Sequence, residues 1–201
     1  MARNMERHQS NIDLRKVHRT LRDNMSSASR DIKSYQITQN ILALLESDFK
    51  GANIFLCFYP FGSEVNLIRL YERLLDMGKS LYFPISNIEE HELTFKRITD
   101  LLTDFDKGHY GIMEPRDSFD TFNYNGEQVV SITPGLVFDR QFNRVGYGAG
   151  FYDRFLSKYP DIITIAPCFD NQLIDELNAC PHDVPMNYIV TEDKILKGDR
   201  L

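Results

Sequence analysis

The sequence predicts an α/β fold, a sandwich with helices on both faces of one sheet. Segments with apolar residues at helical spacing alternate with short apolar segments typical of buried strands. A strand expected at 53–59 is followed by a helix at 64–77 and a strand at 80–85. Such a unit pairs its two strands in parallel across a helical crossover. The length of 201 residues suits a single domain over 1–201.

Two amphipathic helices are expected before the first strand. The apolar stripe of the first consists of Leu14, Val17, Leu21 and Met25. Ser10 precedes this stripe and is expected as the N-cap of the helix. The second helix carries its stripe between residues 32 and 45. Each stripe predicts one helix face packed against the core.

The later elements are shorter. The helix at 64–77 begins with Glu64, a favourable charge at a helix N-terminus, and ends before Gly78, a typical C-terminal cap. Residues 104–125 lack clear periodicity, which predicts a loop. Further strands are expected at 93–98, 128–132, 136–138, 162–166 and 188–191, and helices at 151–159 and near 173–177.

Composition excludes several classes of protein. Hydrophobic residues make up 42% and charged residues 26%, as in globular proteins, and no apolar run approaches the about 20 residues of a membrane span. We see no secretory signal, and the three scattered cysteines form no metal-ligand or disulfide pattern. The net charge of −6 disfavours nucleic-acid binding. A cytoplasmic protein without membrane or nucleic-acid partners is expected.

The segment RVGYGAGFYD, residues 144–153, is the most informative feature. Its alternating glycines are Gly146, Gly148 and Gly150. Glycine permits positive φ and close approach of a ligand, and successive N–H groups of such a loop form a concave anion site. The helix expected next would add free N–H groups that favour phosphate. Glycines alone also make tight turns without a ligand, but the flanking Arg144, Tyr152 and Asp153 favour binding.

Two carboxylates are candidates for Mg²⁺. Asp153 directly follows the glycine loop, and nucleotide-bound Mg²⁺ takes one or two carboxylates together with phosphate oxygens. Capping of the first helical turn explains Asp153 equally well. Asp183, ahead of Pro185, could supply the second carboxylate, although a plain loop residue is expected at such a position too.

A second candidate site follows the first expected strand, because α/β sheets bind ligands at loops beyond the carboxyl ends of strands. Glu64 would accept hydrogen bonds from N–H groups of a ligand there, although a position at a helix start also explains it. Tyr59 and Phe61 could enclose a flat ring or belong to the core. The cations of the first helix, including Arg15 and Arg22, are typical of a solvated face.

Residues 134–156, PGLVFDRQFNRVGYGAGFYDRFL, resemble the signature of the 5-formyltetrahydrofolate cyclo-ligases, also called methenyltetrahydrofolate synthetases. Further motifs similar to those of this family are LR at 14–15, YPFGSEV at 59–65, GIMEP at 111–115 and HDVP at 182–185. The resemblance therefore spans nearly the whole chain. It implies a three-layer αβα sandwich with a mixed, mostly parallel sheet, similar to the sugar-phosphate isomerase and CoA-transferase class.

The resemblance also implies a reaction that uses ATP and Mg²⁺. ATP phosphorylates the formyl oxygen of 5-formyltetrahydrofolate, a second folate nitrogen attacks the activated carbon, and phosphate leaves to give 5,10-methenyltetrahydrofolate. Phosphoryl transfer needs positioned cations and Mg²⁺ near the spreading negative charge. The implied partner is a small-molecule folate, and a monomer is expected.

Site residues follow from the resemblance by position in the motifs. The implied catalytic residues are Arg144 and Tyr152. The implied ATP-binding residues are Asn11, Arg15, Arg144, Val145, Gly146, Tyr147, Gly148, Ala149, Gly150, Phe151 and Tyr152. The implied folate-binding residues are Tyr59, Glu64, Tyr147 and Tyr152. The implied Mg²⁺ ligands are Asp153 and Asp183.

The chain departs from the family motifs in the nucleotide site. Asn11 and Ala149 stand where the motifs have lysine, and Phe151 replaces a tyrosine. Loss of charge-assisted phosphate contacts weakens ATP binding, and Lys16 or Arg140 could compensate. The alternative function is therefore a non-catalytic or diverged folate- or nucleotide-binding member of the family. A sugar-phosphate isomerase-like enzyme is a third candidate, based on fold similarity alone.

Overall fold

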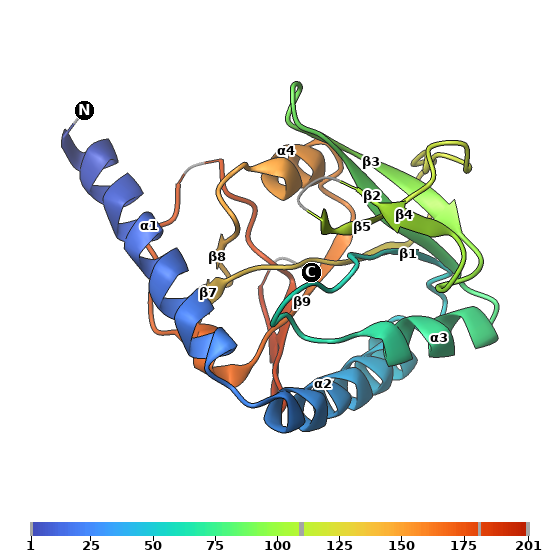
Figure 1. The fold of residues 1–201 in the computed structure, drawn as a ribbon, viewed down its shortest axis with the longest axis horizontal. Helices are drawn as coiled ribbons and strands as arrows, with labels where there is room; N and C mark the ends of the chain where they lie inside the picture. The colour runs from blue at the N-terminus through green and yellow to red at the C-terminus, as the bar shows by residue number, and fades with distance from the viewer. Residues whose placement is uncertain (1, 109–110, 181, 200–201) are drawn as a thin grey trace.

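The computed structural model describes residues 2–108, 111–180 and 182–199. Its largest sheet has seven strands (Figure 1). Their spatial order is β12 (Ile195–Lys197), β11 (Tyr188–Val190), β9 (Ile163–Pro167), β6 (Val129–Ile132), β1 (Ile54–Leu56), β2 (Ser80–Asn87) and β3 (Glu92–Ile98). The edge strands β12 and β3 pair antiparallel with their neighbours, whereas the pairs between the inner strands are parallel. The predicted mixed, mostly parallel sheet is confirmed.

Helices cover both faces of this sheet, as predicted. In Figure 1, α4 (Phe151–Lys158) lies above the sheet, and α2 (Ser27–Asp48) and α3 (Ile68–Asp76) lie below it. Successive side chains of a strand point to opposite faces. Phe55 accordingly belongs to the core between the sheet and helices α2 and α3, and Leu56 belongs to the core between the sheet and α4. No helix in the described part of the chain is long and apolar enough to cross a membrane.

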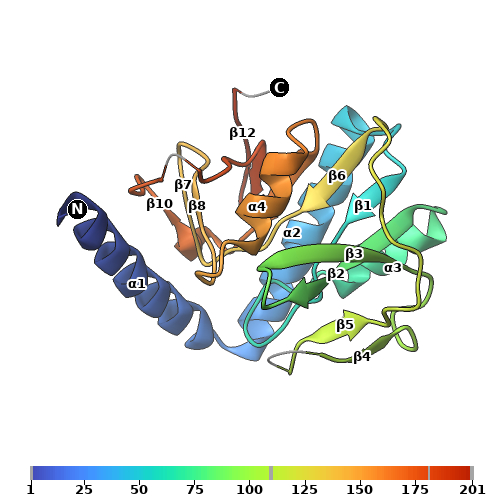
Figure 2. The ribbon, with the colours of Figure 1, turned by 90° about the horizontal axis from the view of Figure 1, so that it is seen from above.

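The first helix, α1 (Ala2–Asp23), differs from the prediction. It includes Ser10, so the predicted N-cap is wrong. Its expected apolar stripe is only half correct, because Val17 is 52% exposed and Leu21 44% exposed, whereas Leu14 and Met25 pack against buried clusters. Figure 2 shows why: α1 lies at the edge of the molecule, beside the small sheet formed by β10, β7 and β8. The bounds of these strands are β7 (Val137–Asp139), β8 (Arg144–Val145) and β10 (Leu173–Ile174).

Three other expectations need correction. Helix α3 begins at Ile68, so Glu64 lies in the loop before the helix and not at its start. The helix expected near 173–177 is wrong, because β10 pairs with β7 there and Asp139 accepts a hydrogen bond from the Leu177 amide at 2.8 Å. The loop expected at 104–125 contains an antiparallel hairpin whose strands are too short to show periodicity. These strands are β4 (Phe105–Lys107) and β5 (Met113–Pro115).

The order of the strands creates a place for a ligand. The chain leaving β1 passes through α3 to β2 on one side, whereas the chain leaving β6 continues to β9 on the other side. β1 and β6 are neighbours in the sheet, so the loops at their carboxyl ends diverge. Ligands of open α/β sheets bind in the crevice at such a point.

Candidate active site

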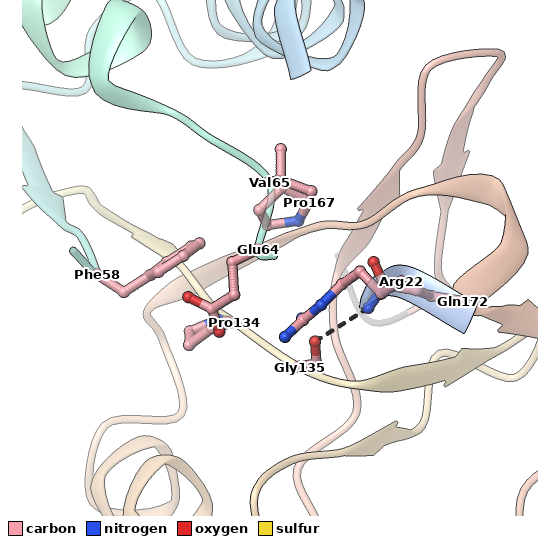
Figure 3. Close-up of a pocket in the computed structure, with 8 residues that line it drawn as sticks. All are labelled: Arg22, Phe58, Glu64, Val65, Pro134, Gly135, Pro167 and Gln172. Atoms are coloured by element: carbon pink, nitrogen blue, oxygen red, sulfur yellow. Dashed lines mark hydrogen bonds between the residues drawn. The ribbon is translucent and has the colours of Figure 1, made fainter. Parts of the chain in front are cut away.

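A pocket lies where the loops after β1 and β6 diverge (Figure 3). It contains about 190 Å³ of space, part of it open to solvent. The residues that line it are Arg22, Phe58, Glu64, Val65, Pro134, Gly135, Pro167 and Gln172. Phe58 and Glu64 come from the loop after β1, and Pro134 and Gly135 come from the loop after β6. The pocket thus combines apolar walls with two charged side chains.

Glu64 provides a buried acceptor in this pocket. Its side chain is only 7% exposed, and Oε2 accepts a hydrogen bond from the Phe61 amide at 3.2 Å. Burial raises the pKa of Glu64, and the hydrogen bond from Tyr147 and the charge of Arg22 partly oppose this rise. A buried carboxylate of this kind is well suited to N–H donors of a ligand.

Tyr147 connects this pocket to the glycine turn at 146–150. Its hydroxyl donates a hydrogen bond to Oε1 of Glu64 and accepts one from Nη2 of Arg22 at 3.1 Å. The Tyr147 ring lies 5.3 Å from the Phe61 ring, centroid to centroid. Burial and the nearby Glu64 raise the pKa of Tyr147, so its hydroxyl keeps its proton. The two candidate sites of the sequence therefore lie side by side.

The turn itself needs its glycines. Gly148 has φ +108° and Gly150 has φ +67°, both in a region that other residues rarely adopt. A Cβ on Gly146 would lie 2.7 Å from Nη1 of Arg144, which is too close. Among the described residues, the backbone amides of 147–150 have no hydrogen-bond acceptor. These amides are therefore available to an anion, next to the N-terminus of α4.

Three guanidinium groups lie against the turn: Arg144, Arg15, and Arg154, which donates to the Ala149 carbonyl. Arg144 is buried, forms an ion pair with Asp153 at 2.9 Å, and lies 5.7 Å from the centre of the Tyr152 ring. Arg15 approaches from α1, and its Nε donates to the Gly146 carbonyl at 2.8 Å. Burial lowers the pKa of Arg15, which Asp183 partly opposes, but such a group remains cationic at neutral pH.

Several buried polar atoms around the turn have no hydrogen-bond partner within the described part of the chain. They include Asn11 Oδ1, Arg144 Nε and Tyr152 Oη. An unpaired buried polar atom costs about 1–3 kcal/mol, so such atoms call for an explanation. All three belong to residues implied at the nucleotide. A polyphosphate fits this environment of free amides and guanidinium groups, and it would give the donors among these atoms acceptors.

The segments that carry the two candidate Mg²⁺ ligands are in contact. Asp153 accepts a hydrogen bond from the amide of Val184, the residue after Asp183, at 3.3 Å. Asp183 itself accepts one from the Cys180 amide at 2.7 Å. No group of three or more potential ligand side chains occurs among the described residues. The arrangement therefore fits Mg²⁺ held by one or two carboxylates and by phosphate oxygens, and not a metal site built from protein alone.

Some of the predicted site residues do not line the pocket. Tyr59 packs against Phe105 at 4.8 Å between ring centroids, and its neighbour Phe58 lines the pocket instead. Ala149 is exposed at the turn. Of the two cations considered as replacements for the missing lysines, Arg140 pairs with Asp175 at 3.2 Å. The other, Lys16, has an exposed side chain. The remaining ATP-implied residues, Val145 and Phe151, are respectively buried at the end of β8 and half-buried at the start of α4.

Sequence reasoning missed the apolar Phe58 and Pro167 and two polar residues of the pocket, Arg22 and Gln172. Arg22, expected on a solvated face, is only 3% exposed. Its separation of seven residues from Arg15 places both on one helix face, which is the signal that could have found it. Gln172 donates to the carbonyls of Gly135 at 3.2 Å and Leu136 at 3.0 Å, and so fixes the loop after β6 (Figure 3). No sequence pattern marks this glutamine.

Comparisons with known proteins identify the family of the chain. The model of the 5-formyltetrahydrofolate cyclo-ligase family matches residues 7–192. The chain belongs to this family. It is 28% identical over 185 residues to the 5-formyltetrahydrofolate cyclo-ligase of Haemophilus influenzae, covering 90% of this chain and 95% of that protein. It is 33% identical over 144 residues to the enzyme of the same name from Mycolicibacterium smegmatis, covering 68% and 72%.

A solved structure is similar to this chain over almost the whole length of both proteins. The NMR structure of Aquifex aeolicus 5,10-methenyltetrahydrofolate synthetase superposes with a TM-score of 0.78 at 26% identity. The superposition covers 93% of this chain and 92% of that one. The predicted family and the predicted fold class are both confirmed.

Proposed function

We propose that this protein converts 5-formyltetrahydrofolate to 5,10-methenyltetrahydrofolate in a reaction that depends on ATP and Mg²⁺. The names of its relatives support the conversion. The observation that carries the dependence on ATP is the hydrogen bond between Tyr147 and Glu64. This bond joins a turn suited to phosphates to a pocket suited to a flat, polar ring. Both substrates would therefore bind next to the side chain of Tyr147.

The folate would bind at the pocket after β1 and β6. Glu64 would accept hydrogen bonds from the N–H groups of the pterin ring, and Phe58, Val65 and Pro167 would enclose its faces. Tyr147 forms a hydrogen bond to Glu64 beside the pocket. Movement of the Tyr147 side chain, which is 38% exposed, would enlarge the pocket.

The nucleotide would bind at the glycine turn. The free amides of 147–150 and the guanidinium groups of Arg15 and Arg144 would hold the phosphates, and Asp153 and Asp183 would hold Mg²⁺. ATP supplies the phosphoryl group that makes the formyl oxygen a leaving group. Arg144 donates to the carbonyl of Pro134 in the pocket wall at 3.3 Å and lies over the Tyr152 ring, and both residues would stabilise the negative charge that spreads during transfer.

A turnover assay tests this proposal. Purified protein is mixed with 5-formyltetrahydrofolate, Mg²⁺ and ATP, and the absorbance of 5,10-methenyltetrahydrofolate is followed. We expect saturable product formation that stops when Mg²⁺ is chelated. Folded protein that forms no product at millimolar ATP would refute the proposal.

A second candidate, a folate-binding protein without efficient ATP use, is favoured by one observation. The turn carries the exposed Ala149 where the family motifs place a lysine, and the side chain of Asn11 replaces a second cation. Calorimetry distinguishes the two functions. Binding of 5-formyltetrahydrofolate without binding of ATP would favour the second.

A further inference from the structure

Arg22 is an unusual residue for the inner face of a surface helix. It lies in the last turn of α1 and is buried, while the apolar Val17 and Leu21 of the same helix are exposed. Burial of a guanidinium group in preference to apolar side chains is unfavourable unless the charge has partners. The partners of Arg22 therefore indicate what this position does.

Only part of its hydrogen-bonding capacity is used inside the protein. Nε donates to Ser63 Oγ at 3.0 Å, and Nη2 donates to the Tyr147 hydroxyl at 3.1 Å. Nη1 has no acceptor among the described residues, and the side chain lines the pocket together with Glu64 (Figure 3). Arg22 thus presents donors to the pocket.

Arg22 and Glu64 do not form an ion pair within the described structure. Instead, the hydroxyl of Tyr147 accepts from Arg22 and donates to Glu64. One hydroxyl therefore satisfies a cationic donor on one side and an anionic acceptor on the other. A ligand that displaces it must offer the same pair of groups, an acceptor beside a donor. The amide edge of a ring, with C=O next to N–H, offers this pair.

We propose that Arg22 is a specificity-determining residue that binds the ring carbonyl of the pterin next to the N–H groups held by Glu64. The inference rests on the proposed function and deepens it. A 4-oxo pteridine presents an acceptor to Arg22. A 4-amino pteridine presents a donor at the same position, which leaves the pocket-facing donors of Arg22 without an acceptor. The pocket should therefore select 4-oxo over 4-amino ligands.

The test is the ratio of two affinities. Binding of 5-formyltetrahydrofolate and of its 4-amino-4-deoxy analogue is measured by calorimetry. For the unaltered protein we expect the 4-oxo ligand to bind about tenfold to a hundredfold more tightly, the range for a hydrogen bond to a charged group. In Arg22→Met this ratio should fall about tenfold, and Arg22→Lys should keep part of it. A remainder is expected from Glu64, because ring N3 carries a hydrogen in the 4-oxo ring and a lone pair in the neutral 4-amino ring. General damage to the pocket would weaken both ligands alike and leave the ratio unchanged.

A matched control is Arg30→Gln, because Arg30 donates to the Met25 carbonyl near the end of α1 and does not line the pocket. Its ratio should equal that of the unaltered protein. Should Arg22→Met fail to fold by thermal melting, the ratio in Arg22→Lys decides. An unchanged ratio in the folded variants refutes the role of Arg22 and leaves the proposed function standing. Failure of the unaltered protein to bind either ligand refutes the proposed function as well.

Discussion

At the scale of single residues, the buried carboxylate of Glu64 affects the stability of the protein before a ligand binds. Burial raises its pKa, and a group whose pKa is raised on folding stabilises the protein below its unfolded pKa. That contribution is lost as the pH rises through the folded pKa. At neutral pH, the ionised Glu64 therefore destabilises the free protein, and a ligand with N–H donors relieves this penalty.

The substitution Glu64→Gln should separate stability from function. We expect the melting temperature at neutral pH to stay equal or rise, because no charge is buried, while kcat/KM for the folate falls about tenfold to a hundredfold. Melting curves between pH 5 and 8 and steady-state kinetics measure both. Glu192→Gln is the control. This buried carboxylate pairs with Lys33 and accepts from the Asp170 amide at 3.0 Å, so its loss should lower the melting temperature and spare activity. A lower melting temperature in Glu64→Gln would contradict the argument.

The conformation of Gly148 leads to a second prediction. With φ +108°, an alanine there is strained, and its Cβ would lie 3.4 Å from Cζ of Arg15. Gly148→Ala should cost about 1–3 kcal/mol and raise the KM for ATP more than the KM for folate. Gly51→Ala is the control, because the nearest atom to its Cβ is at 3.7 Å and its φ is not positive. Equal effects on both substrates would argue against a phosphate site at this turn.

Ala149 offers a gain of function. It is exposed and has no positive φ, so Ala149→Lys should change stability by less than about 0.5 kcal/mol. A lysine on the turn adds a cation near the phosphates, and the KM for ATP should fall about two- to tenfold. Leu102→Lys, at a position 91% exposed, controls for net charge. An unchanged KM in Ala149→Lys would show that the phosphates lie elsewhere.

At the scale of elements, α1 shows where sequence patterns mislead. Its apolar residues at helical spacing predict a buried stripe, but its inner face carries His18 and Arg22. The pattern fails because this helix borders a polar site and a small sheet, whereas an amphipathic helix over a large sheet buries its apolar face. Helix α2 follows the usual rule, since Ile37 and Ile41 are fully buried.

The orientation of α1 can be tested by substitution of its outer face. The double variant Val17→Gln and Leu21→Gln should melt within about 2 °C of the unaltered protein and retain activity, because both side chains are already exposed. Leu14→Ala, on the side that packs against β7 and β8, should melt at a lower temperature. Loss of stability in the double variant would place α1 in a different orientation.

The sequence predicts apolar, buried elements well and polar ones poorly. The inner strands and α4 follow from runs of apolar residues and from helical spacing. The hairpin of β4 and β5 does not, because its strands contain charged residues that are not buried, whereas the equally short β1, β7 and β11 are mostly apolar and largely buried. β10 is also missed, because its two residues are strand only through pairing with β7. Such elements are determined by tertiary contacts and not by local pattern.

At the scale of the whole molecule, the site is assembled from distant segments. Arg22 and Tyr147 are separated by 125 residues, and Glu64 and Tyr147 by 83. The sequence identifies the glycine turn and Glu64 as separate candidates, and the family resemblance adds their partners. It cannot show that they touch, because this depends on the order of β1 and β6 in the sheet. The bridging position of Tyr147 is therefore visible only in the structure.

This bridge predicts that the two substrates bind with positive coupling. Phosphates bound to the amides of 147–150 would reposition the turn and withdraw the Tyr147 hydroxyl from Glu64, which frees the pocket. A non-hydrolysable ATP analogue with Mg²⁺ should therefore raise the affinity for 5-formyltetrahydrofolate about fivefold or more, and the folate should raise the affinity for the analogue by the same factor. Calorimetry in both orders of addition measures the two factors.

The variant Tyr147→Phe decides whether the hydroxyl carries this coupling. Without it, Glu64 keeps only the Phe61 amide and Arg22 keeps only Ser63 as an internal partner, so the folate should bind more tightly in the absence of nucleotide than it binds to the unaltered protein. The gain from adding the analogue should then shrink towards none, because a ligand shifts an equilibrium only by its differential affinity for the two states. Coupling of full size in Tyr147→Phe would mean that the turn and the pocket communicate through the backbone, and that the hydroxyl is only a bystander.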